Sequence, residues 1–295
     1  MDSGADARRA WRNLQRSAVD PGAHAQLPLE LGLRLLDHLD GLRVAPERIL
    51  VLGGGAGLLQ APLAEQFPAA ALIYADPVAG LLAQLPRSSR LQRWFGAARE
   101  PHRIACLPSR LPLRNGCVDL VVALGVLGWE DPERVFGESR RVLSGDGLLL
   151  FNALGPDTLR EWRAALSQAR PAIDPLGRSV LRLMDMHDLA DAASHAGLAS
   201  PVVDMEHLTV HYASLETLLV DLRASGGNAL RERPRGLMTP GQLRRARDAM
   251  EALRAPEGLP VTLEAIYGHA WNTRPLVDPA GRAVIPIRPV SAPGA

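Results

Sequence analysis

The stretch ILVLGGGAG, Ile49–Gly57, decides the fold of this chain. Its apolar first half predicts a buried strand, and the glycines that follow predict a tight turn into a helix over 57–67. Glycine suits such a turn because it adopts positive φ and lets a ligand approach the backbone without a Cβ in the way. A strand, a glycine-rich turn and a helix in this order are typical of nucleotide-binding α/β proteins, although a purely structural turn would use the same residues.

The spacing of the glycines separates two kinds of nucleotide site. A dinucleotide site has the pattern G-x-G-x-x-G, which would place its third glycine at Leu58. The glycines here are Gly53, Gly55 and Gly57, with Gly54 between the first two. This G-x-G-x-G spacing is similar to that of S-adenosylmethionine-dependent methyltransferases.

An acidic residue follows the next predicted strand, which covers 71–75. Asp76, with Pro77 after it, comes about 20 residues after the glycines, where a carboxylate can accept both ribose hydroxyls of an adenosine ligand. Because NAD enzymes use the same device, Asp76 supports adenosine binding without selecting the cofactor. A helix cap or an ordinary loop carboxylate is the alternative interpretation.

The rest of the chain continues the alternation of strands and helices and predicts the α/β class. Up to Asn152 the pattern is typical of a parallel sheet with crossover helices. We therefore expect one α/β sandwich whose last strands are separated by a helical insertion at about 214–257. The further predicted strands cover 103–107, 118–124, 148–151, 207–212 and 261–271, and the predicted helices cover 131–143, 158–169, 185–196 and 214–224.

Composition excludes several classes of protein. The chain has 295 residues and a net charge of +1, and its 33 basic residues are all arginine. Without lysine there can be no Walker A phosphate loop, protein kinase, lysine Schiff base or pyridoxal phosphate enzyme. The balanced charge predicts neither a nucleic-acid partner nor a membrane partner, and no apolar run is long enough to cross a bilayer.

Cysteines and histidines give two further expectations. Cys106 and Cys117 form no CxxC pair and no disulfide framework, which favours the cytoplasm. His207 and His211 lie on one face of a predicted strand, just after Asp204 and Glu206. A metal ion could bind there, but polar alternation on an edge strand explains the same pattern, and we predict no metal site.

Other segments carry a closer resemblance. The segments RLPLRNGCVDLVV (110–122) and RVLSGDGLLLF (141–151) resemble passages of class I methyltransferases. The segments GPDTLRE (155–161), DMHDL (185–189) and YGHAW (267–271) resemble the malonyl-[acyl-carrier protein] O-methyltransferase family of biotin synthesis. The resemblance covers the chain from about Arg8 to Trp271.

The resemblance implies a class I methyltransferase fold, which is Rossmann-like and has a seven-stranded mixed sheet. It implies methyl transfer from S-adenosylmethionine to the free carboxyl of a malonyl thioester on an acyl-carrier protein. It assigns no catalytic residue. The residues expected to bind the cofactor are Gly53, Gly54, Gly55, Gly57, Asp76 and Pro77, and the candidate substrate residues are Trp129, Arg231 and Arg244.

The same resemblance divides the chain and suggests a docking face. We expect a helical N-terminal lid over 1–30, a methyltransferase domain over 31–272 and a proline-rich tail over 273–295. Carrier proteins are acidic, so the arginines of the insertion are a candidate docking face, and a solvated helix face is the alternative. These arginines are Arg231, Arg233, Arg235, Arg244, Arg245 and Arg247.

Several residues depart from the family pattern. Val51 and Leu107 stand where the family usually has acidic residues, and Pro21 stands where an aromatic residue often closes over the site. Ala123-Leu124 replaces a Ser-Asn pair. These losses leave alternatives to an active methyltransferase: a weakened enzyme, a cofactor-binding protein hydroxylase like the related complex I assembly factor, or a domain kept only for protein binding.

Overall fold

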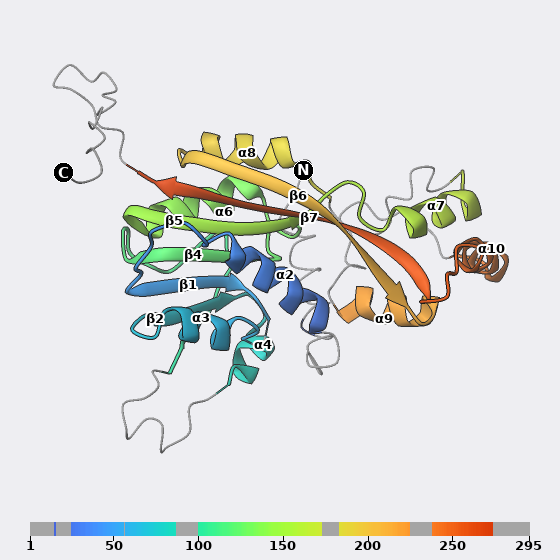
Figure 1. Ribbon diagram of the computed structural model, residues 1–295, viewed down its shortest axis with the longest axis horizontal. Coiled ribbons are helices and arrows are strands. Elements are labelled where there is room, and N and C mark those ends of the chain that lie inside the picture. Colours follow the sequence, from blue (N-terminus) through green and yellow to red (C-terminus); the bar gives the residue numbers. More distant parts are fainter. Residues whose placement is uncertain are drawn as a thin grey trace, which may run out of the picture.

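A seven-stranded mixed sheet forms the centre of the protein in the computed structural model (Figure 1). The structure describes residue 15 and residues 25–55, 57–86, 100–172, 183–224 and 238–273. The strand order is β3-β2-β1-β4-β5-β7-β6. The strands are β1 (Arg48–Gly53), β2 (Ala71–Asp76), β3 (His102–Ala105), β4 (Val118–Leu124), β5 (Leu143–Leu154), β6 (Ala199–Tyr212) and β7 (Leu259–Asn272).

The strands from β3 to β5 are parallel, whereas β7 runs antiparallel to both of its neighbours. This confirms the predicted seven-stranded mixed sheet, and α9 and α10 form the predicted helical insertion before the last strand. The described helices are α2 (Gln26–Asp37), α3 (Gln60–Gln66), α4 (Ala79–Gln84), α6 (Pro132–Val142), α7 (Arg160–Ala169), α8 (Met186–His195), α9 (Leu215–Ala224) and α10 (Pro240–Glu251).

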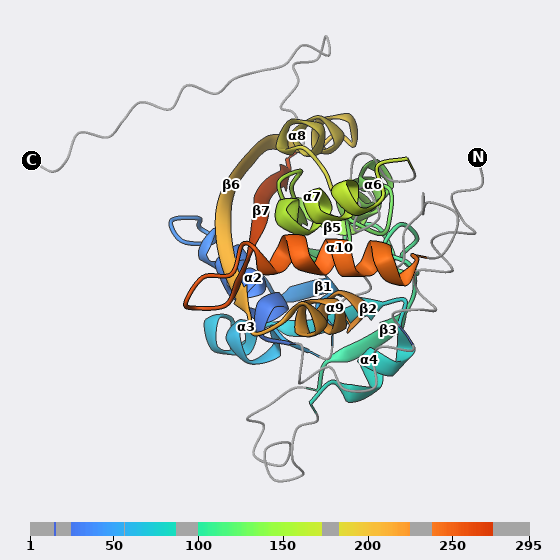
Figure 2. The ribbon, with the colours of Figure 1, turned by 90° about the vertical axis from the view of Figure 1, so that its right-hand side faces the viewer.

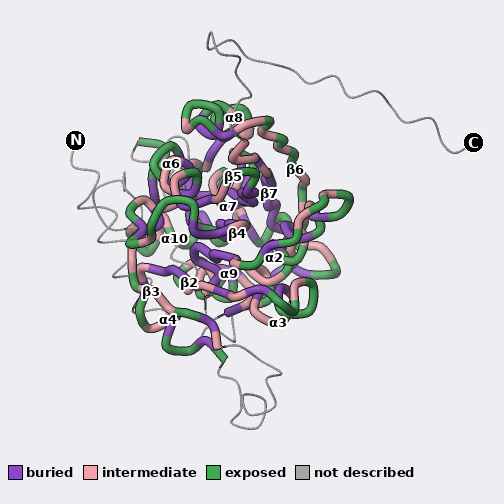
Figure 3. Tube along the Cα trace, turned by 90° about the vertical axis from the view of Figure 1, so that its left-hand side faces the viewer, coloured by how far each residue is buried: buried purple, intermediate pink, exposed green. Residues whose placement is uncertain are grey.

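Helices cover both faces of the sheet, which is why its strands are apolar on both sides. Leu50 and Leu52 of β1 pack in a core with α6 and α8, while Ile49 and Val51 pack in a second core with α2, α3 and α4. The central strands are the most deeply buried part of the chain (Figure 3). The parallel sheet is therefore held from both sides, and its carboxyl edge is left for ligands.

A third core lies beyond the end of β5. The strands β6 and β7 continue past β5 as a two-stranded ribbon, because β5 pairs with β7 only from Ala265 onward. The helices α7, α9 and α10 pack around this ribbon, with Trp162 and Met250 in their shared core. We call α7, α9, α10 and the ribbon residues 207–212 and 259–264 the cap. Figures 1 and 2 show the cap helices gathered at one side of the sheet.

The turn after β5 fixes the cap to the sheet. The backbone amide of Gly155 donates to the carbonyl of Glu264 at 2.8 Å, and the amide of Asp157 donates to its carboxylate at 2.6 Å. The hydroxyl of Thr158 also bonds the backbone of Glu264. A Cβ on Gly155 would lie 2.3 Å from the Glu264 carboxyl carbon, so this contact requires glycine. We call Gly155–Thr158 with Glu264 the junction.

The structure corrects several predicted boundaries. The strand expected at 207–212 begins at Ala199, and the strand expected at 148–151 extends over 143–154. The first half of β6 was missed because an exposed edge strand carries polar residues. The helices expected from 57 and 158 begin at Gln60 and Arg160, after turns.

The beginning of the described chain differs from the predicted domain scheme. The helix α2 was not predicted, and it spans the boundary expected between residues 30 and 31, with Leu35 fully buried against the sheet. Of the helical lid expected over 1–30, residues 1–14 and 16–24 lie outside the described residues, as does the tail over 274–295. No described helix combines the length and apolar character needed to cross a membrane.

Candidate cofactor site and active centre

The glycine turn after β1 has a backbone that only glycine adopts easily. Gly53, Gly54, Gly55 and Gly57 all have positive φ, between 60° and 88°. A Cβ on Gly53 would lie 2.6 Å from the carbonyl oxygen of Leu124 on the neighbouring strand β4. The turn is therefore pressed against the end of β4 and presents backbone, rather than side chains, at the carboxyl edge of the sheet.

Asp76 stands beside this turn at the end of β2. Its side chain is buried, with 4% exposed, and its Oδ1 accepts a hydrogen bond of 2.7 Å from the amide of Val78. No hydrogen bond from a described residue reaches Oδ2. Burial raises the pKa of Asp76 to about 6, against the opposing effect of the Val78 amide. Asp76 is thus mostly ionised at neutral pH and has an oxygen available to a ligand, besides shaping its own loop.

Strand register brings these parts together. Gly53 pairs with Leu124, and Leu52 pairs with Ala75, so Asp76 and Gly53 end adjacent parallel strands. Pro77 follows Asp76 and is half-buried. A glycine turn without side chains and a partly free buried carboxylate, side by side at the carboxyl edge, fit the ribose and backbone-facing parts of an adenosine cofactor.

The loop after β4 forms the next part of this edge. Gly125, with φ of 68°, donates its amide to the Asn152 side chain at 2.8 Å. Trp129, predicted to contact substrate, is half-buried in the same loop. Glu130 is buried and accepts a hydrogen bond of 2.7 Å from the Ser109 hydroxyl. Asn152 is not among the predicted site residues, although an amide inside the apolar run of β5 is a signal for a buried hydrogen-bonding role.

The residues that depart from the family pattern lie in different surroundings. Val51 is fully buried in the core beneath the turn, and its Cγ1 would lie 3.2 Å from a Cβ on Gly54. Val51 therefore supports the glycine turn from inside the core. Leu107 is 39% exposed in the loop after β3, close in the chain to Cys106, whose amide donates to the carbonyl of Asp76. Pro21 lies outside the described residues.

The predicted arginine face is only partly free. Arg244 is exposed on α10 and makes no ion pair with a described residue. Arg245 donates to the carbonyl of Ala169 at the end of α7, and Arg247 pairs with Glu216 of α9. These two arginines hold the cap helices together. The predicted positions Arg231, Arg233 and Arg235 lie outside the described residues.

The polar residues of β6 are also divided among different partners. Asp204 lies 3.7 Å from His38, and Glu206 pairs with Arg34 of α2 at 2.8 Å. His207 instead lies 3.4 Å from Asp157 of the junction. The four residues considered for a metal in the sequence therefore do not form one described cluster.

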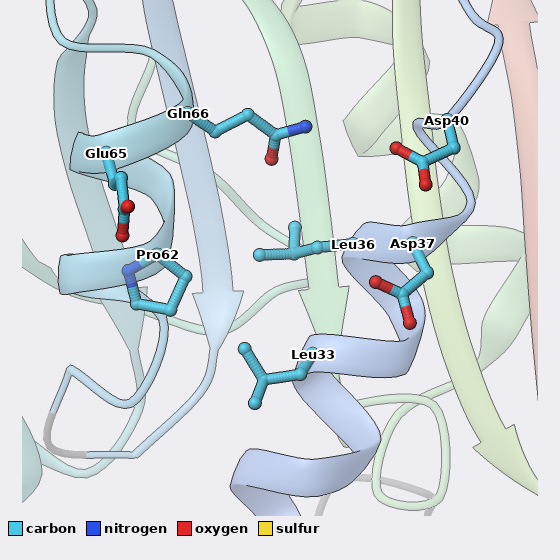
Figure 4. Close-up of a pocket in the computed structure, with 7 residues that line it drawn as sticks. All are labelled: Leu33, Leu36, Asp37, Asp40, Pro62, Glu65 and Gln66. Carbon is cyan, nitrogen blue, oxygen red and sulfur yellow. The ribbon is translucent and has the colours of Figure 1, made fainter.

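A pocket of about 290 Å³ lies on another part of the surface, between α2 and α3 (Figure 4). Leu33 and Leu36 point from α2 toward Pro62 of α3, with carboxylates around them. None of the predicted cofactor residues lines it. Its remaining lining residues are Asp37, Asp40, Glu65 and Gln66.

Comparison with known proteins agrees with this arrangement. The Methyltransferase domain family model matches residues 50–151, which run from β1 into β5. Two solved structures are similar in fold. The YcgJ protein from Bacillus subtilis has a TM-score of 0.53 and 16% sequence identity, and the match covers 83% of this chain and 98% of that protein. A SAM-dependent methyltransferase from Thermotoga maritima has a TM-score of 0.51 and 16% sequence identity, and the match covers 90% of this chain and 100% of that protein.

Curated relatives match almost the whole chain. The malonyl-[acyl-carrier protein] O-methyltransferase of Methylovorus sp. strain MP688 is 37% identical over 96% of this chain and 95% of its own length. The protein of the same name from Gallionella capsiferriformans is 38% identical over 95% of this chain and 96% of its own. The chain therefore belongs to the malonyl-[acyl-carrier protein] O-methyltransferase family and is an S-adenosylmethionine-dependent methyltransferase.

Proposed function

We propose that this protein methylates the free carboxyl of a malonyl thioester carried by an acyl-carrier protein, a step of biotin precursor synthesis in the cytoplasm. The observation that carries the proposal is that Gly53 and Asp76 end adjacent parallel strands at the carboxyl edge of the sheet, in a chain whose relatives bear this name. A protein hydroxylase or a binding-only domain of the same fold is not favoured by those relatives.

The glycine turn and Asp76 would hold the cofactor. The turn offers backbone amides and no Cβ at Gly53–Gly55, which suits the amino acid end of the cofactor. Oδ2 of Asp76, which accepts no hydrogen bond from a described residue, would accept hydrogen bonds from the ribose hydroxyls, and Pro77 would line the same side. Leu107, exposed nearby, would offer apolar contact to the base where the family has a carboxylate.

The chemistry asks little acid–base work of the protein. When bound, S-adenosylmethionine would supply an electrophilic methyl group on a sulfonium, and the leaving group would be the thioether S-adenosylhomocysteine. A malonyl carboxylate is already ionised at neutral pH, so no base has to remove a proton. The residues of the chain would hold the carboxylate oxygen in line with the methyl and exclude water from it, with Trp129 a candidate wall of that space.

The cap would receive the carrier protein. Arg244 is exposed on α10 and forms no ion pair with a described residue, and Arg231 is a further candidate from the same insertion. A carrier protein has an acidic surface, so such charges would raise the rate of encounter more than the final affinity. The paired Arg245 and Arg247 would contribute by keeping α10 on α7 and α9.

A labelled-methyl assay tests the proposal directly. Purified protein is incubated with S-adenosylmethionine that carries a labelled methyl group and with malonyl-acyl carrier protein, and the label is followed into the acyl chain. We expect a base-labile methyl ester on the malonyl group, and none with acetyl-acyl carrier protein, which lacks the second carboxyl. Cofactor binding without labelling of any malonyl thioester would contradict the proposal.

A further inference from the structure

The junction gathers metal-ligating side chains that are far apart in the sequence. Asp157 comes from the turn after β5, His207 from β6 and Glu264 from β7. One ligand atom of each lies within 4.8 Å of the other two. His207 and Glu264 are register partners on adjacent strands, so the sheet itself places them side by side. None of these residues has a role in the cofactor site.

One ligand–ligand distance in the cluster already matches a tetrahedral site. Metal–ligand bonds of about 2.0–2.1 Å at tetrahedral angles separate the ligand atoms by about 3.3–3.4 Å. His207 Nε2 already lies 3.4 Å from Asp157 Oδ2. The side chains of His207 and Asp157 are 43% and 53% exposed, so both can rotate by the small amount needed and an ion can enter from solvent.

Glu264 is the member of the cluster whose side chain is held in place. Its side chain is buried, with 7% exposed, and the amide of Asp157 holds Oε2 in place. No hydrogen bond from a described residue reaches Oε1. The missing Cβ of Gly155 leaves room for this carboxylate. Because the amide of Asp157 already orients Glu264, the side chain of Glu264 would lose little conformational entropy when an ion binds.

The charges of the cluster favour a cation. Asp157 and Glu264 bring two carboxylates to a single imidazole, and a third carboxylate, that of Glu161 in the first turn of α7, bonds to Thr262 of the adjacent strand β7. Arg160 lies 3.7 Å from Asp157 and also contacts Glu161, while Arg163 donates to the carbonyl of Pro156 in the same turn. We propose that Asp157, His207 and Glu264 bind a divalent transition metal ion such as Zn²⁺, which ties the turn after β5 to the cap ribbon. One nitrogen and two carboxylate oxygens suit this class of ion.

Calorimetric titration of the tag-free, chelator-treated full chain with Zn²⁺ tests the proposal without measuring activity. We expect one equivalent to bind with a micromolar dissociation constant, weakened at least about tenfold by His207→Gln. The matched control is His211→Gln, which removes an exposed histidine on the same face of the same strand and leaves binding unchanged. Arg160→Gln removes the competing cation and tightens binding.

A second variant separates the loss of a metal ligand from the loss of the local fold. Asp157→Asn keeps the backbone amide that holds Glu264, so the junction stays intact while one ligand is lost. We expect it to weaken Zn²⁺ binding and to abolish the visible bands of four-coordinate Co²⁺ bound to the parent protein. Absence of binding by the parent protein, or equal loss in the His207 and His211 variants, overturns the proposal.

Discussion

The parallel half of the sheet and the cap are stabilised in different ways and present different groups to a ligand. The parallel half presents the backbone of Gly53–Gly57 at its edge, fixed by strand register and by cores on both faces. The cap consists of three helices around a two-stranded ribbon, with one small core and ion pairs such as Arg247 to Glu216. The structure of the cofactor region therefore depends on backbone geometry, whereas that of the cap depends on side-chain packing.

Breaking the backbone geometry has the largest expected effect. Gly53→Ala places a methyl group 2.6 Å from the carbonyl of Leu124 at a φ of 73°. We expect the affinity for S-adenosylhomocysteine, measured by calorimetry, to fall at least about 100-fold. Gly80→Ala, in a helix with open space around it, serves as the control and leaves affinity unchanged.

Gly55→Ala separates ligand contact from folding at the same turn. Its Cβ would have 3.8 Å of clearance from the nearest described atoms, so the fold tolerates it better than a Cβ at Gly53. Weaker binding with an intact thermal transition would locate the ligand against Gly55. Unchanged binding in both glycine variants would show that the turn does not cradle the cofactor.

Substitutions in the two cores test whether the cap and the sheet are stabilised separately. Trp162→Ala removes the largest side chain of the cap core, and Phe136→Ala removes a buried ring of the sheet core. Each should cost about 3–5 kcal/mol of unfolding free energy. We expect Trp162→Ala to retain cofactor affinity within about twofold while methylation of the carrier-bound substrate is lost. Phe136→Ala should lower both; equal behaviour of the two variants would mean that cap and sheet unfold as one unit.

Acid pH should act on the cofactor region through Asp76. The pKa of its carboxyl is raised to about 6 by burial, so protonation below this pH competes with binding of ribose hydroxyls to the ionised form. Affinity for S-adenosylhomocysteine should be constant above neutral pH and fall about tenfold per pH unit well below pH 6. Asp76→Asn should bind weakly at every pH.

The same raised pKa has a consequence for stability with the opposite sign. A carboxyl whose pKa is higher in the folded chain costs stability; the cost grows as the pH rises from its ordinary pKa of 3.8 and is complete above about pH 6. Asp76→Asn should therefore raise the unfolding free energy of the ligand-free protein at pH 7, by about 1–2 kcal/mol. The gain should disappear below the usual range of carboxyl pKa values. A less stable variant at pH 7 would contradict this account.

The smallest expected effect concerns the surface of the cap. Arg244→Glu should raise KM for malonyl-acyl carrier protein about 2–10-fold at low salt, with kcat unchanged, and the effect should shrink at high salt. Arg43→Glu, exposed outside the cap, is the control. Equal effects of the two substitutions would point to overall charge rather than to docking on α10.

The sequence predicted the two regions unequally. The turn at Gly53–Gly57 and Asp76 could be predicted because steric rules demand particular residues there, and continuous apolar strands mark a parallel sheet. In the cap, α7 and α9 were predicted as helices, but α10 and the packing of the three helices were not, since helix packing leaves no comparable constraint on residue type. The meeting of Asp157, His207 and Glu264 depends on a register between β6 and β7 that no local pattern encodes.

Because β7 is one uninterrupted strand that runs through both regions, its length sets the distance between them. Its residues 259–264 continue past the end of β5, which at about 3.3 Å per residue sets a reach of about 20 Å. Residues 259–264 stay paired with β6 beyond the end of β5, so the length of this ribbon sets the spacing between the cap and the rest of the sheet. A tethered substrate would then be selected by length: an arm that docks on the cap delivers its terminal group at a fixed depth, and a shorter or longer arm misses it.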